Sequence, residues 1–361
     1  MKKKVLCAMS GGVDSSVATA LLLEAGYEVA GVTCQIWLDD LCSVTSGKSC
    51  CSNDAIEDAR QTAHQLGIKH YVFNYRELFE DKVIKPFCNS YLEGKTPNPC
   101  MDCNRYIRSQ DLLSKALGMG FDYMATGHYV RRLYNEETQE YVLKTGFDQK
   151  KDQSYFLYQM NQEQLSHMLF PLGDFEKSYI REIARKHNFE VAEKKDSQDI
   201  CFVLEGTYGD FIETYTGKEK PPASIYYKDG VFLGRGKPIY NYTIGQRKGL
   251  GIAFGNPVYV IGIDSLNNRV TLGEKEDFIN KGLLCDDVFF ISERPLEEER
   301  EVLVKVRYKS PPKKGIYWTA GSGFKIKFTE PVEGVTIGQS AVLYDLDKET
   351  VLGGGRITKP L

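Results

Sequence analysis

Residues 10–15 read Ser-Gly-Gly-Val-Asp-Ser, a combination typical of a loop that binds phosphate. An apolar run at 5–9 precedes them and a helical pattern at 16–23 follows, which predicts a strand, a glycine turn and the start of a helix. The two glycines let the backbone approach a ligand closely, and the N–H groups at the helix start attract an anion. Asp14 adds a negative charge, which a Mg²⁺ ion bridging its carboxylate and a phosphate would balance. The loop has no lysine and therefore differs from a Walker A loop.

Three cysteines form the second chemical signal. Cys100 and Cys103 make a Cys-x-x-Cys pair behind a stiff Thr-Pro-Asn-Pro stretch at 96–99, and Cys201 ends the polar run 196–201. A structural zinc site would need a second ligand pair, and the sequence offers none at a suitable spacing. Three thiols that converge on one site suffice either for sulfur transfer or for binding an iron–sulfur cluster.

The other cysteines carry weaker signals. A cysteine taken alone is most often a small buried side chain, and we interpret three of them in that way: Cys7, Cys88 and Cys285. Cys50 and Cys51 are adjacent in a polar stretch, and their role stays open.

Composition bounds the class of protein. The chain has 361 residues, 42% of them hydrophobic, ten cysteines and a net charge of −3. This length predicts more than one domain, and this composition predicts folded cores rather than disorder. No apolar run approaches the roughly 18 residues that would span a membrane, and the run behind the N-terminal lysines is too short for a signal peptide. We expect a cytoplasmic monomer without membrane contact, whose cysteines are mostly thiols, metal ligands or catalytic groups.

The first half of the chain alternates strand and helix patterns. Strands are predicted at 29–36, 70–74 and 123–126, a hairpin at 130–145, and helices at 52–66, 161–169 and 177–187, with a further helix ending at 112–117. This order predicts an α/β domain, with a parallel sheet and helices on both of its faces. Ligands bind beyond the carboxyl ends of such strands, where Ser10, Cys34 and Gly127 fall.

The second half is richer in short strand patterns. They lie at 226–233, 258–263, 269–272, 301–308, 324–328 and 341–344. We therefore expect a small mixed α+β, β-rich module and then a C-terminal β-barrel. The predicted domains are 1–204, 205–281 and 282–361.

One of these strand patterns has alternating charge. Between residues 302 and 315, basic side chains alternate with apolar ones, Lys305, Arg307 and Lys309 against Val304, Val306 and Tyr308. A strand with this pattern has one basic face and one apolar face. We interpret the basic face as a contact for an RNA backbone, with an ordinary solvated barrel face as the alternative.

Six motifs occur in order along the chain. They are 8–15 (Ala-Met-Ser-Gly-Gly-Val-Asp-Ser), 96–99 with Cys103-Asn104, 125–129 (Ala-Thr-Gly-His-Tyr), 151–157, 199–202 and 245–251. The first resembles the pyrophosphate loop of the N-type ATP pyrophosphatases. Together the motifs resemble the bacterial tRNA-specific 2-thiouridylases, the MnmA/TrmU family, over essentially the whole chain. The resemblance implies an N-terminal domain of the adenine nucleotide alpha-hydrolase-like fold and a barrel that binds tRNA.

The resemblance also implies an activity. Members of the family use ATP to adenylate the 2-oxygen of the wobble uridine in tRNAs for Lys, Glu and Gln, and sulfur then displaces AMP to give 2-thiouridine. The implied ligands are ATP, Mg²⁺ and tRNA, and the implied partner is a sulfur-relay protein or a cysteine desulfurase. Activation of this kind is chemically necessary, because the oxygen of a uracil carbonyl is a poor leaving group until it becomes part of AMP.

Individual residues take roles from the same resemblance. Cys103 would be the nucleophile, Cys201 would carry a persulfide, and Asp14 would act at the phosphates with Mg²⁺. The ATP contacts would be Ala8, Met9, Ser10, Gly11, Gly12, Val13, Asp14, Ser15, Cys34 and Gly127. The tRNA contacts would be Asn98, Pro99 and Cys100 at the target base, and elsewhere His128, Lys151, Asp152, Gln153, Arg307, Tyr308 and Gln339.

Cys100 leaves the sulfur chemistry open. Some members of the family have an aspartate at this position, and others have a cysteine as this chain does. If Cys100, Cys103 and Cys201 held an iron–sulfur cluster, the iron without a protein ligand would bind sulfide. A persulfide scheme needs only Cys103 and Cys201.

Two rival functions compete with thiolation. One is a synthetase that amidates or ligates a small molecule, and it leaves the thiols without a role. The other is a tRNA-binding protein that has lost catalysis, and the intact loop at 10–15 argues against it.

Overall fold

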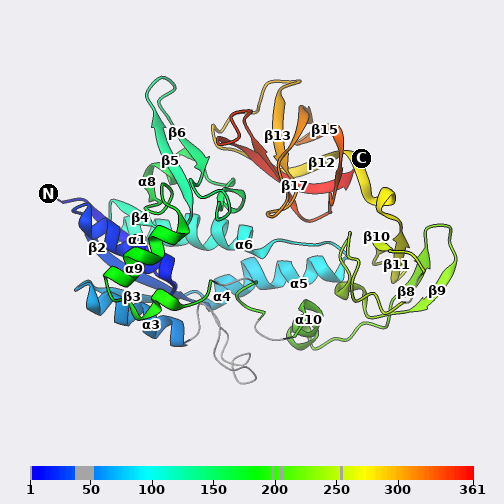
Figure 1. Ribbon diagram of the computed structural model, residues 1–361, viewed down its shortest axis with the longest axis horizontal. Helices are drawn as coiled ribbons and strands as arrows, with labels where there is room; N and C mark the ends of the chain where they lie inside the picture. The colour runs from blue at the N-terminus through cyan, green and yellow to red at the C-terminus, as the bar shows by residue number, and fades with distance from the viewer. Residues whose placement is uncertain (1, 37–52, 197–198, 204–205, 253–254) are drawn as a thin grey trace.

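The computed structural model describes residues 2–36, 53–196, 199–203, 206–252 and 255–361. The polar stretch with Cys50 and Cys51 lies outside these residues. Figure 1 shows an N-terminal sheet with helices, a small sheet module and a C-terminal barrel, with a long helical segment running from the first part toward the module. Within the described part of the chain, no helix is both long and apolar enough to cross a membrane. The predicted fold class is confirmed: an α/β domain, a small β-rich module and a barrel.

Five parallel strands form the first sheet, in the spatial order β3-β2-β1-β4-β7. Their bounds are β1 Lys4–Ala8, β2 Glu28–Gln35, β3 His70–Asn74, β4 Tyr123–Ala125 and β7 Met168–Leu169. Because the strands are parallel, their carboxyl ends meet at one edge of the sheet. The segments that follow β1 and β4 start from that edge, as the sequence predicts.

Helices cover both faces of this sheet. Successive side chains of β1 enter different cores, because neighbouring residues of a strand point to opposite faces. Val5 and Cys7 pack with helices α1 and α9, whereas Leu6 packs with the helical segment 76–118. The helices next to Val5 and Cys7 are α1 Val13–Glu24 and α9 Lys177–Lys186, and α3 Asn53–Gln65 packs beside α1 and β2.

The sequence predicted only the last turns of a helix, at 112–117, whereas the structure has a series of helical elements from 76 to 118. The series consists of α4 Arg76–Phe79, η1 Glu80–Ile84, α5 Lys85–Leu92, α6 Pro99–Asp102, η2 Cys103–Leu112 and α7 Leu113–Gly118. The elements η1 and η2 have the wider turns of a π-helix, which change the spacing of the buried residues. The buried residues of such a segment do not recur every 3.6 residues, so the sequence does not predict it as a helix.

The small module is a four-stranded sheet with the order β10-β11-β8-β9. Its strands are β8 Ser224–Tyr227, β9 Phe232–Arg235, β10 Tyr259–Asp264 and β11 Arg269–Gly273, preceded by helix α10 Tyr208–Thr216. The strand predicted at 226–233 is therefore wrong as a single element. A turn at 228–231 divides it into a hairpin, in which Tyr227 N–H donates to Val231 O and Gly230 N–H to Tyr227 O.

Six strands close the C-terminal barrel in the order β12-β15-β14-β13-β16-β17. Their bounds are β12 Ile279–Phe290, β13 Glu301–Lys305, β14 Lys313–Ala320, β15 Gly323–Glu333, β16 Ser340–Tyr344 and β17 Val351–Pro360. The strand predicted at 301–308 ends earlier, at Lys305. A turn follows, closed by hydrogen bonds between Arg307 and Ser310, and two prolines after Ser310 cannot donate to a strand ladder.

The remaining elements lie around the sheet and between the domains. The predicted hairpin is confirmed as β5 Val130–Asn135 and β6 Glu140–Thr145. The helix predicted at 161–169 is shorter, because its last two residues form β7. The other helical elements are α8 Gln162–His167, η3 Ser154–Phe156, η4 Glu190–Glu193, η5 Ile239–Asn241 and η6 Lys275–Phe278.

Arg307 joins the barrel to the small module. Its Nε donates to Gly334 O at 2.9 Å, and its Nη2 donates to Ile244 O at 2.9 Å and to the hydroxyl of Thr336. Burial lowers the pKa of its guanidinium, which still has a charge at neutral pH. The side chain is committed to carbonyl and hydroxyl acceptors of the protein, which sequence alternation could not reveal.

Replacing Arg307 by lysine should destabilise the domain junction. A single ammonium cannot make the same set of directed hydrogen bonds, so at least one buried acceptor loses its partner, at a cost of about 1–3 kcal/mol. We expect the first thermal unfolding transition of Arg307→Lys to shift downward. The matched control is Lys359→Met on the exposed face of β17, which should leave the transition unchanged. An unaltered transition in Arg307→Lys would contradict the junction role.

Candidate active site

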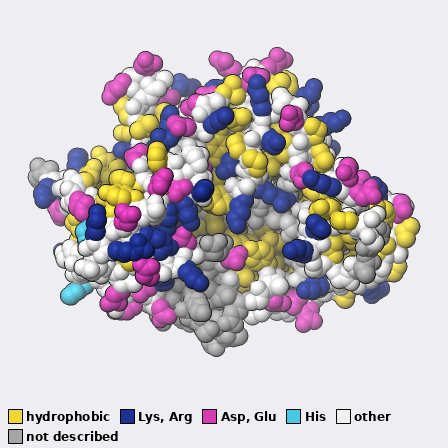
Figure 2. Space-filling view, viewed as in Figure 1, with side chains coloured by type: hydrophobic (Ala, Val, Ile, Leu, Met, Phe, Trp, Pro, Cys, Tyr) yellow, Lys and Arg dark blue, Asp and Glu magenta, His cyan; other side chains and the backbone are white. Residues whose placement is uncertain are grey.

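A cavity of about 1330 Å³ opens at the carboxyl edge of the parallel sheet. One wall is the loop at 8–15, a second is the helical segment 99–112, and a third is the barrel, through Leu303, Lys305 and Tyr344. Figure 2 shows a hollow in the middle of this face, with apolar side chains at its floor and Lys and Arg side chains around it. The cavity therefore combines an apolar interior with a positively charged rim, a setting suited to a phosphorylated aromatic ligand.

The loop at the start of α1 is folded onto itself. Gly12 is the N-cap of α1, and Ser10 N–H donates to Ser15 Oγ at 3.1 Å. Gly11 has a φ of 65°, and a Cβ there would collide with the carbonyl oxygen of Ala55. Only glycine fits this position, because the backbone conformation and the close approach of α3 both exclude a side chain. The helix N-terminus behind the loop gives it a positive potential.

Asp14 at the first turn of α1 is paired with a buried lysine. Lys177 Nζ lies 2.7 and 2.8 Å from the two carboxylate oxygens, and Tyr129 OH donates to the same carboxylate at 2.7 Å. Lys177 is only 7% exposed. The charge of Asp14, which suggested Mg²⁺ in the sequence, is thus balanced by Lys177. The carboxylate does not fit a metal without losing these partners, and we derive no step through Mg²⁺.

Asp196 extends this row of charges toward the cavity. Its carboxylate accepts from Lys151 at 2.7 Å, from Lys177 at 2.9 Å and from Arg181 at 2.9 Å. Burial opposes ionisation, but hydrogen bonds from Lys151 and Lys177 outweigh it and lower the pKa of Asp196 to about 2. Asp196 is therefore a carboxylate at any physiological pH, and it fixes Lys151 at the rim of the cavity.

Lys177 and Lys194 are site residues that the sequence analysis missed. Lys194 lines the cavity, and its Nζ donates to Gly11 O at 3.1 Å and to Asp58. The Lys-Lys-Asp sequence at 194–196, directly before the motif with Cys201, was an available signal for Lys194. Lys177 gives no such signal, because it reaches Asp14 only through the packing of α9 against α1.

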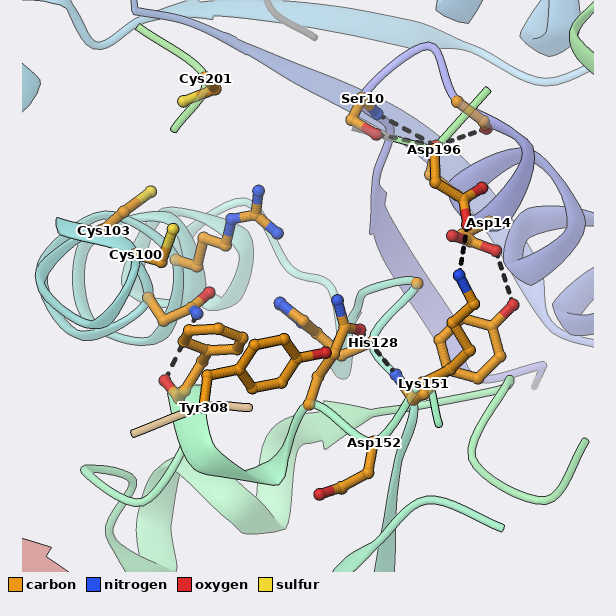
Figure 3. A pocket seen from close by; sticks show the side chains of 18 of the residues that line it. Ser10, Asp14, Cys100, Cys103, His128, Lys151, Asp152, Asp196, Cys201 and Tyr308 are labelled. Carbon is orange, nitrogen blue, oxygen red and sulfur yellow. Dashed lines mark hydrogen bonds and ion pairs between the residues drawn. The ribbon is translucent and has the colours of Figure 1, made fainter. Parts of the chain in front are cut away.

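Two of the thiols stand on one helical segment. Helix α6 begins at Pro99, with Asn98 as its N-cap. Cys100 and Cys103 are three residues apart, a spacing that places side chains on one face of a helix. Both line the cavity, and Figure 3 shows them side by side on this helix, with Cys201 on a separate segment. All three side chains are partly buried.

An aromatic cluster holds the segment of Cys201. The ring of Phe202 packs at 5.7 Å from Phe79, 5.1 Å from Phe87 and 5.2 Å from Phe211, measured between ring centroids. Phe202 is buried, and both Phe202 and Cys201 line the cavity. Phe202 thus anchors the neighbouring Cys201 through contacts with the three helices α4, α5 and α10.

An iron–sulfur cluster held by the three thiols stays a prediction. Among the described residues, no three side chains of His, Cys, Asp or Glu lie close enough together to hold a metal ion. That finding concerns a single ion, and the thiolates of a cluster bind different irons and lie farther apart. We derive no step through a cluster.

Cys34 and His128 line the cavity in uncharged forms. Burial raises the pKa of the Cys34 thiol to about 12, so it stays protonated. Burial, together with the positive charge of Arg108, lowers the pKa of His128 to about 3, and its Nδ1 lies 2.8 Å from Thr126 Oγ1. Neither residue offers a charge to a phosphate. A Cβ at Gly127, the residue before His128, would lie 2.9 Å from the backbone of Asp14, so this glycine permits β4 and α1 to approach closely.

The residues predicted to contact tRNA fall into two groups. The group that lines the cavity consists of Pro99, Cys100, His128, Lys151, Asp152, Gln153 and Tyr308. Asn98, Arg307 and Gln339 lie outside its lining. Gln339 Nε2 donates to the carbonyl oxygens of Thr96 and Pro97, at 2.9 and 3.2 Å, so it fastens the loop before α6 to the barrel.

Several of these residues also have structural partners. Asp152 accepts hydrogen bonds from the N–H of Gly146 and Ser154, and Gln153 Oε1 accepts from Tyr129 N–H. The ring of Tyr308 lies 4.4 Å from that of Phe156. The arginines near the thiols differ, because Arg108 lines the cavity and Arg105 turns toward Asp287 of the barrel.

Models of protein families match the chain in three successive stretches. They are described as a tRNA methyl transferase HUP domain (residues 3–205), a tRNA methyl transferase PRC-barrel domain (209–274) and an aminomethyltransferase beta-barrel domain (280–357). The tRNA-specific 2-thiouridylase MnmA of Clostridioides difficile (strain 630) is 48% identical over 100% of this chain and 99% of its own length. The protein of the same name from Acetivibrio thermocellus is 47% identical over 99% of each chain. The chain belongs to the tRNA-specific 2-thiouridylase MnmA family.

Membership of the MnmA family confirms the resemblance inferred from the six sequence motifs. Among solved structures, a 4-thiouridine synthetase in complex with RNA and ATP covers 56% of this chain and 45% of its own, with 19% identity and a TM-score of 0.35. A likeness that weak carries no argument about this chain.

The neutral state of His128 predicts a dependence of stability on pH. The unfolded chain protonates this histidine below about pH 6.5, whereas the folded chain resists protonation down to about pH 3. Its contribution to folding is therefore complete above pH 6.5 and is lost as the pH falls toward 3. When the pH is lowered from 6.5 to 5, the free energy of unfolding in urea should fall less in His128→Gln than in the parent protein. The two slopes should differ by up to about 1.4 kcal/mol per pH unit. Equal slopes would contradict burial of a neutral imidazole.

Proposed function

We propose that this protein is an ATP-dependent tRNA-uridine 2-sulfurtransferase, which converts the wobble uridine of tRNAs for Lys, Glu and Gln into 2-thiouridine. The observation that carries the proposal is one cavity lined by both the glycine loop at 10–15 and the thiols of Cys100, Cys103 and Cys201. The curated relatives are named tRNA-specific 2-thiouridylase, and they match the whole chain. An activating nucleotide and a sulfur carrier would thus meet at the same base.

ATP is the first substrate in this scheme. Its phosphates would lie on the backbone N–H groups of residues 10–15, where a helix N-terminus favours anions. The neighbouring contacts of the nucleotide would be Ala8, Met9, Cys34 and Gly127, all of which line the cavity. The protonated thiol of Cys34 suits an adenosine contact better than a reactive role.

The first step joins AMP to the base. The 2-oxygen of the uridine attacks the α-phosphorus of ATP, the bond to the β-phosphate oxygen breaks, and pyrophosphate leaves with that electron pair. Lys151 and Lys194 line the cavity near the loop, and their charges would stabilise the leaving pyrophosphate. The uridine oxygen then belongs to AMP, which is a much better leaving group than the original carbonyl oxygen.

The second step delivers sulfur. Cys201 would carry a persulfide from a sulfur-relay protein or a cysteine desulfurase, and its terminal sulfur attacks C2 of the activated base while AMP leaves. The thiolate of Cys103 then attacks the sulfur of Cys201, which releases 2-thiouridine and forms a Cys103–Cys201 disulfide. An external thiol reductant returns both cysteines to thiols. Disulfide bonding needs a sulfur separation of about 2 Å, so the segment of Cys201 must approach the helix of Cys103 during the cycle.

The base and the rest of the tRNA would contact the other side of the cavity. Pro99 and Cys100 would lie against the target uridine, and Lys151, Tyr308 and the barrel face near Lys305 would contact the anticodon arm. Lys305 lies at the apolar side of the cavity and is shielded from solvent. This burial lowers the pKa of its ammonium group, and the opposing effect of the Asp152 charge is smaller. The predicted domain bounds and the cytoplasmic location stay predictions.

Methyl transfer is the alternative suggested by the descriptions of the family models. That reaction uses neither a phosphate loop nor three thiols, and it would leave the composition of the cavity unexplained. A small-molecule synthetase would use the loop but not the thiols. Thiolation accounts for both sets of residues.

The proposal is tested by separating its two steps. In Cys103→Ser, formation of 2-thiouridine should fall by at least about 100-fold, because the release of sulfur from Cys201 needs a thiolate. Release of pyrophosphate in the presence of unmodified tRNA should persist, since the phosphate loop is unchanged. Nucleoside mass spectrometry and a pyrophosphate assay measure the two steps on the same samples.

Cys88→Ala is the matched control for this experiment. Cys88 is a buried cysteine of α5 and does not line the cavity. Its variant should keep both activities. Full thiolation by Cys103→Ser, or a methylated nucleoside as the product, would contradict the proposal.

A further inference from the structure

The helix that carries Cys100 and Cys103 is held by the barrel on its other side. Met101, between the two thiols, is buried, and its sulfur accepts a hydrogen bond from Ser340 Oγ of β16 at 3.0 Å. Asp102, directly before Cys103, is buried as well and pairs with Arg356 of β17 at 3.0 Å. Two consecutive residues next to Cys103 thus contact a different domain.

Four charges alternate along this contact. Arg356 lies 3.0 Å from Asp102 and 3.8 Å from Asp287, and Arg105 Nη1 lies 2.9 and 3.1 Å from the carboxylate oxygens of Asp287. The helix and the barrel each supply one acid and one base. We call these four residues the charge latch: Asp102, Arg105, Asp287 and Arg356.

The barrel strand is distorted where Asp287 meets the helix. The register of β12 against β17 shifts between Asp286 and Phe289, which marks a β-bulge, and Asp287 has a φ of 46°. Bulges redirect side chains, and a positive φ is uncommon for residues other than glycine. The distortion presents the carboxylate to Arg105, whose guanidinium also lies 4.3 Å from the centre of the Phe289 ring. The strand thus departs from regular geometry at the residue that completes the latch.

We propose that the charge latch positions Cys103 for sulfur transfer, so that the barrel sets the orientation of the nucleophile as well as forming a wall of the cavity. This inference rests on the proposed function of Cys103. The four side chains are positioning residues, because they act through the helix and not on the substrate. A tRNA that moves the barrel relative to the sheet would move Asp102 and, with it, the neighbouring Cys103.

Charge pairs suit positioning better than they suit stability. Burying ions has a desolvation cost that an apolar contact avoids, whereas paired charges accept only one register of helix against barrel. Apolar and hydroxyl contacts already join the domains nearby, since Tyr155 OH donates to Ser340 O at 2.9 Å and Tyr158 OH lies 3.1 Å from Ser340 Oγ. Loss of one latch residue should therefore loosen the helix without separating the domains.

The test compares the reactivity of Cys103 with that of a buried cysteine. Alkylation by iodoacetamide at fixed pH is followed for the Cys103 and Cys88 peptides by mass spectrometry in Arg105→Met, Asp287→Asn and the double variant. We expect Cys103 to react about threefold faster or more in each single variant, with Cys88 unchanged and with the double variant no faster than the singles. Single-turnover thiolation should fall about tenfold while the KM for ATP stays within about twofold.

Two controls separate positioning from general stability. Arg300→Met removes an ion pair within the barrel, to Asp345 at 3.1 Å, and should change neither rate. Arg105→Lys keeps the positive charge and should recover part of the thiolation rate. Parent-like rates for Cys103 alkylation and thiolation in both single variants would overturn the inference, and so would a parallel rise for Cys103 and Cys88. If Cys103→Ser still thiolates tRNA, the proposed function fails, but the alkylation result still reports whether the latch holds the helix.

Discussion

The attachment of residues 96–105 to the C-terminal barrel is the contact on which the cavity depends. Thr96 N–H donates to Ile337 O at 2.9 Å, Gln339 donates to the carbonyl oxygens of Thr96 and Pro97, and Asp102 pairs with Arg356. These contacts join residues more than 200 positions apart in the sequence and place two thiols opposite the glycine loop. The sheet supplies one side of the cavity and the barrel supplies the other, so neither domain forms the site alone.

Charge balance at the glycine loop is the second constraint. Asp14 and Asp196 bracket Lys177, and Asp196 also holds Lys151 at the cavity rim. These carboxylates order the cations before a nucleotide is present, which is the condition under which electrostatic stabilisation of a leaving group is most effective. The same arrangement explains an aspartate in a loop that binds anions, because its charge is already neutralised by a buried lysine.

Local signals predicted much of the fold and part of the site. The strand, glycine turn and helix around residues 10–15 and the hairpin at 130–145 follow from nearby residues, so the sequence predicts them correctly. The segment 103–112 escapes prediction because a π-helix breaks the spacing of 3.6 residues per turn. The strand predicted at 301–308 is too long, because the turn that ends it depends on hydrogen bonds between Arg307 and Ser310. Lys177 and the partners of Asp102 could not be predicted, because tertiary packing alone brings them to the site.

If ATP activates the oxygen that sulfur later replaces, this oxygen must leave the base as part of AMP, and isotope transfer measures that directly. The substrate is tRNA with ¹⁸O at the 2-position of the wobble uridine, and the mass of the released AMP is measured together with the amount of 2-thiouridine. We expect one ¹⁸O atom in AMP for each 2-thiouridine formed, since the uridine oxygen leaves with the α-phosphate. Unlabelled AMP accompanying full thiolation would contradict it, because the oxygen would then have left without passing through an adenylated base.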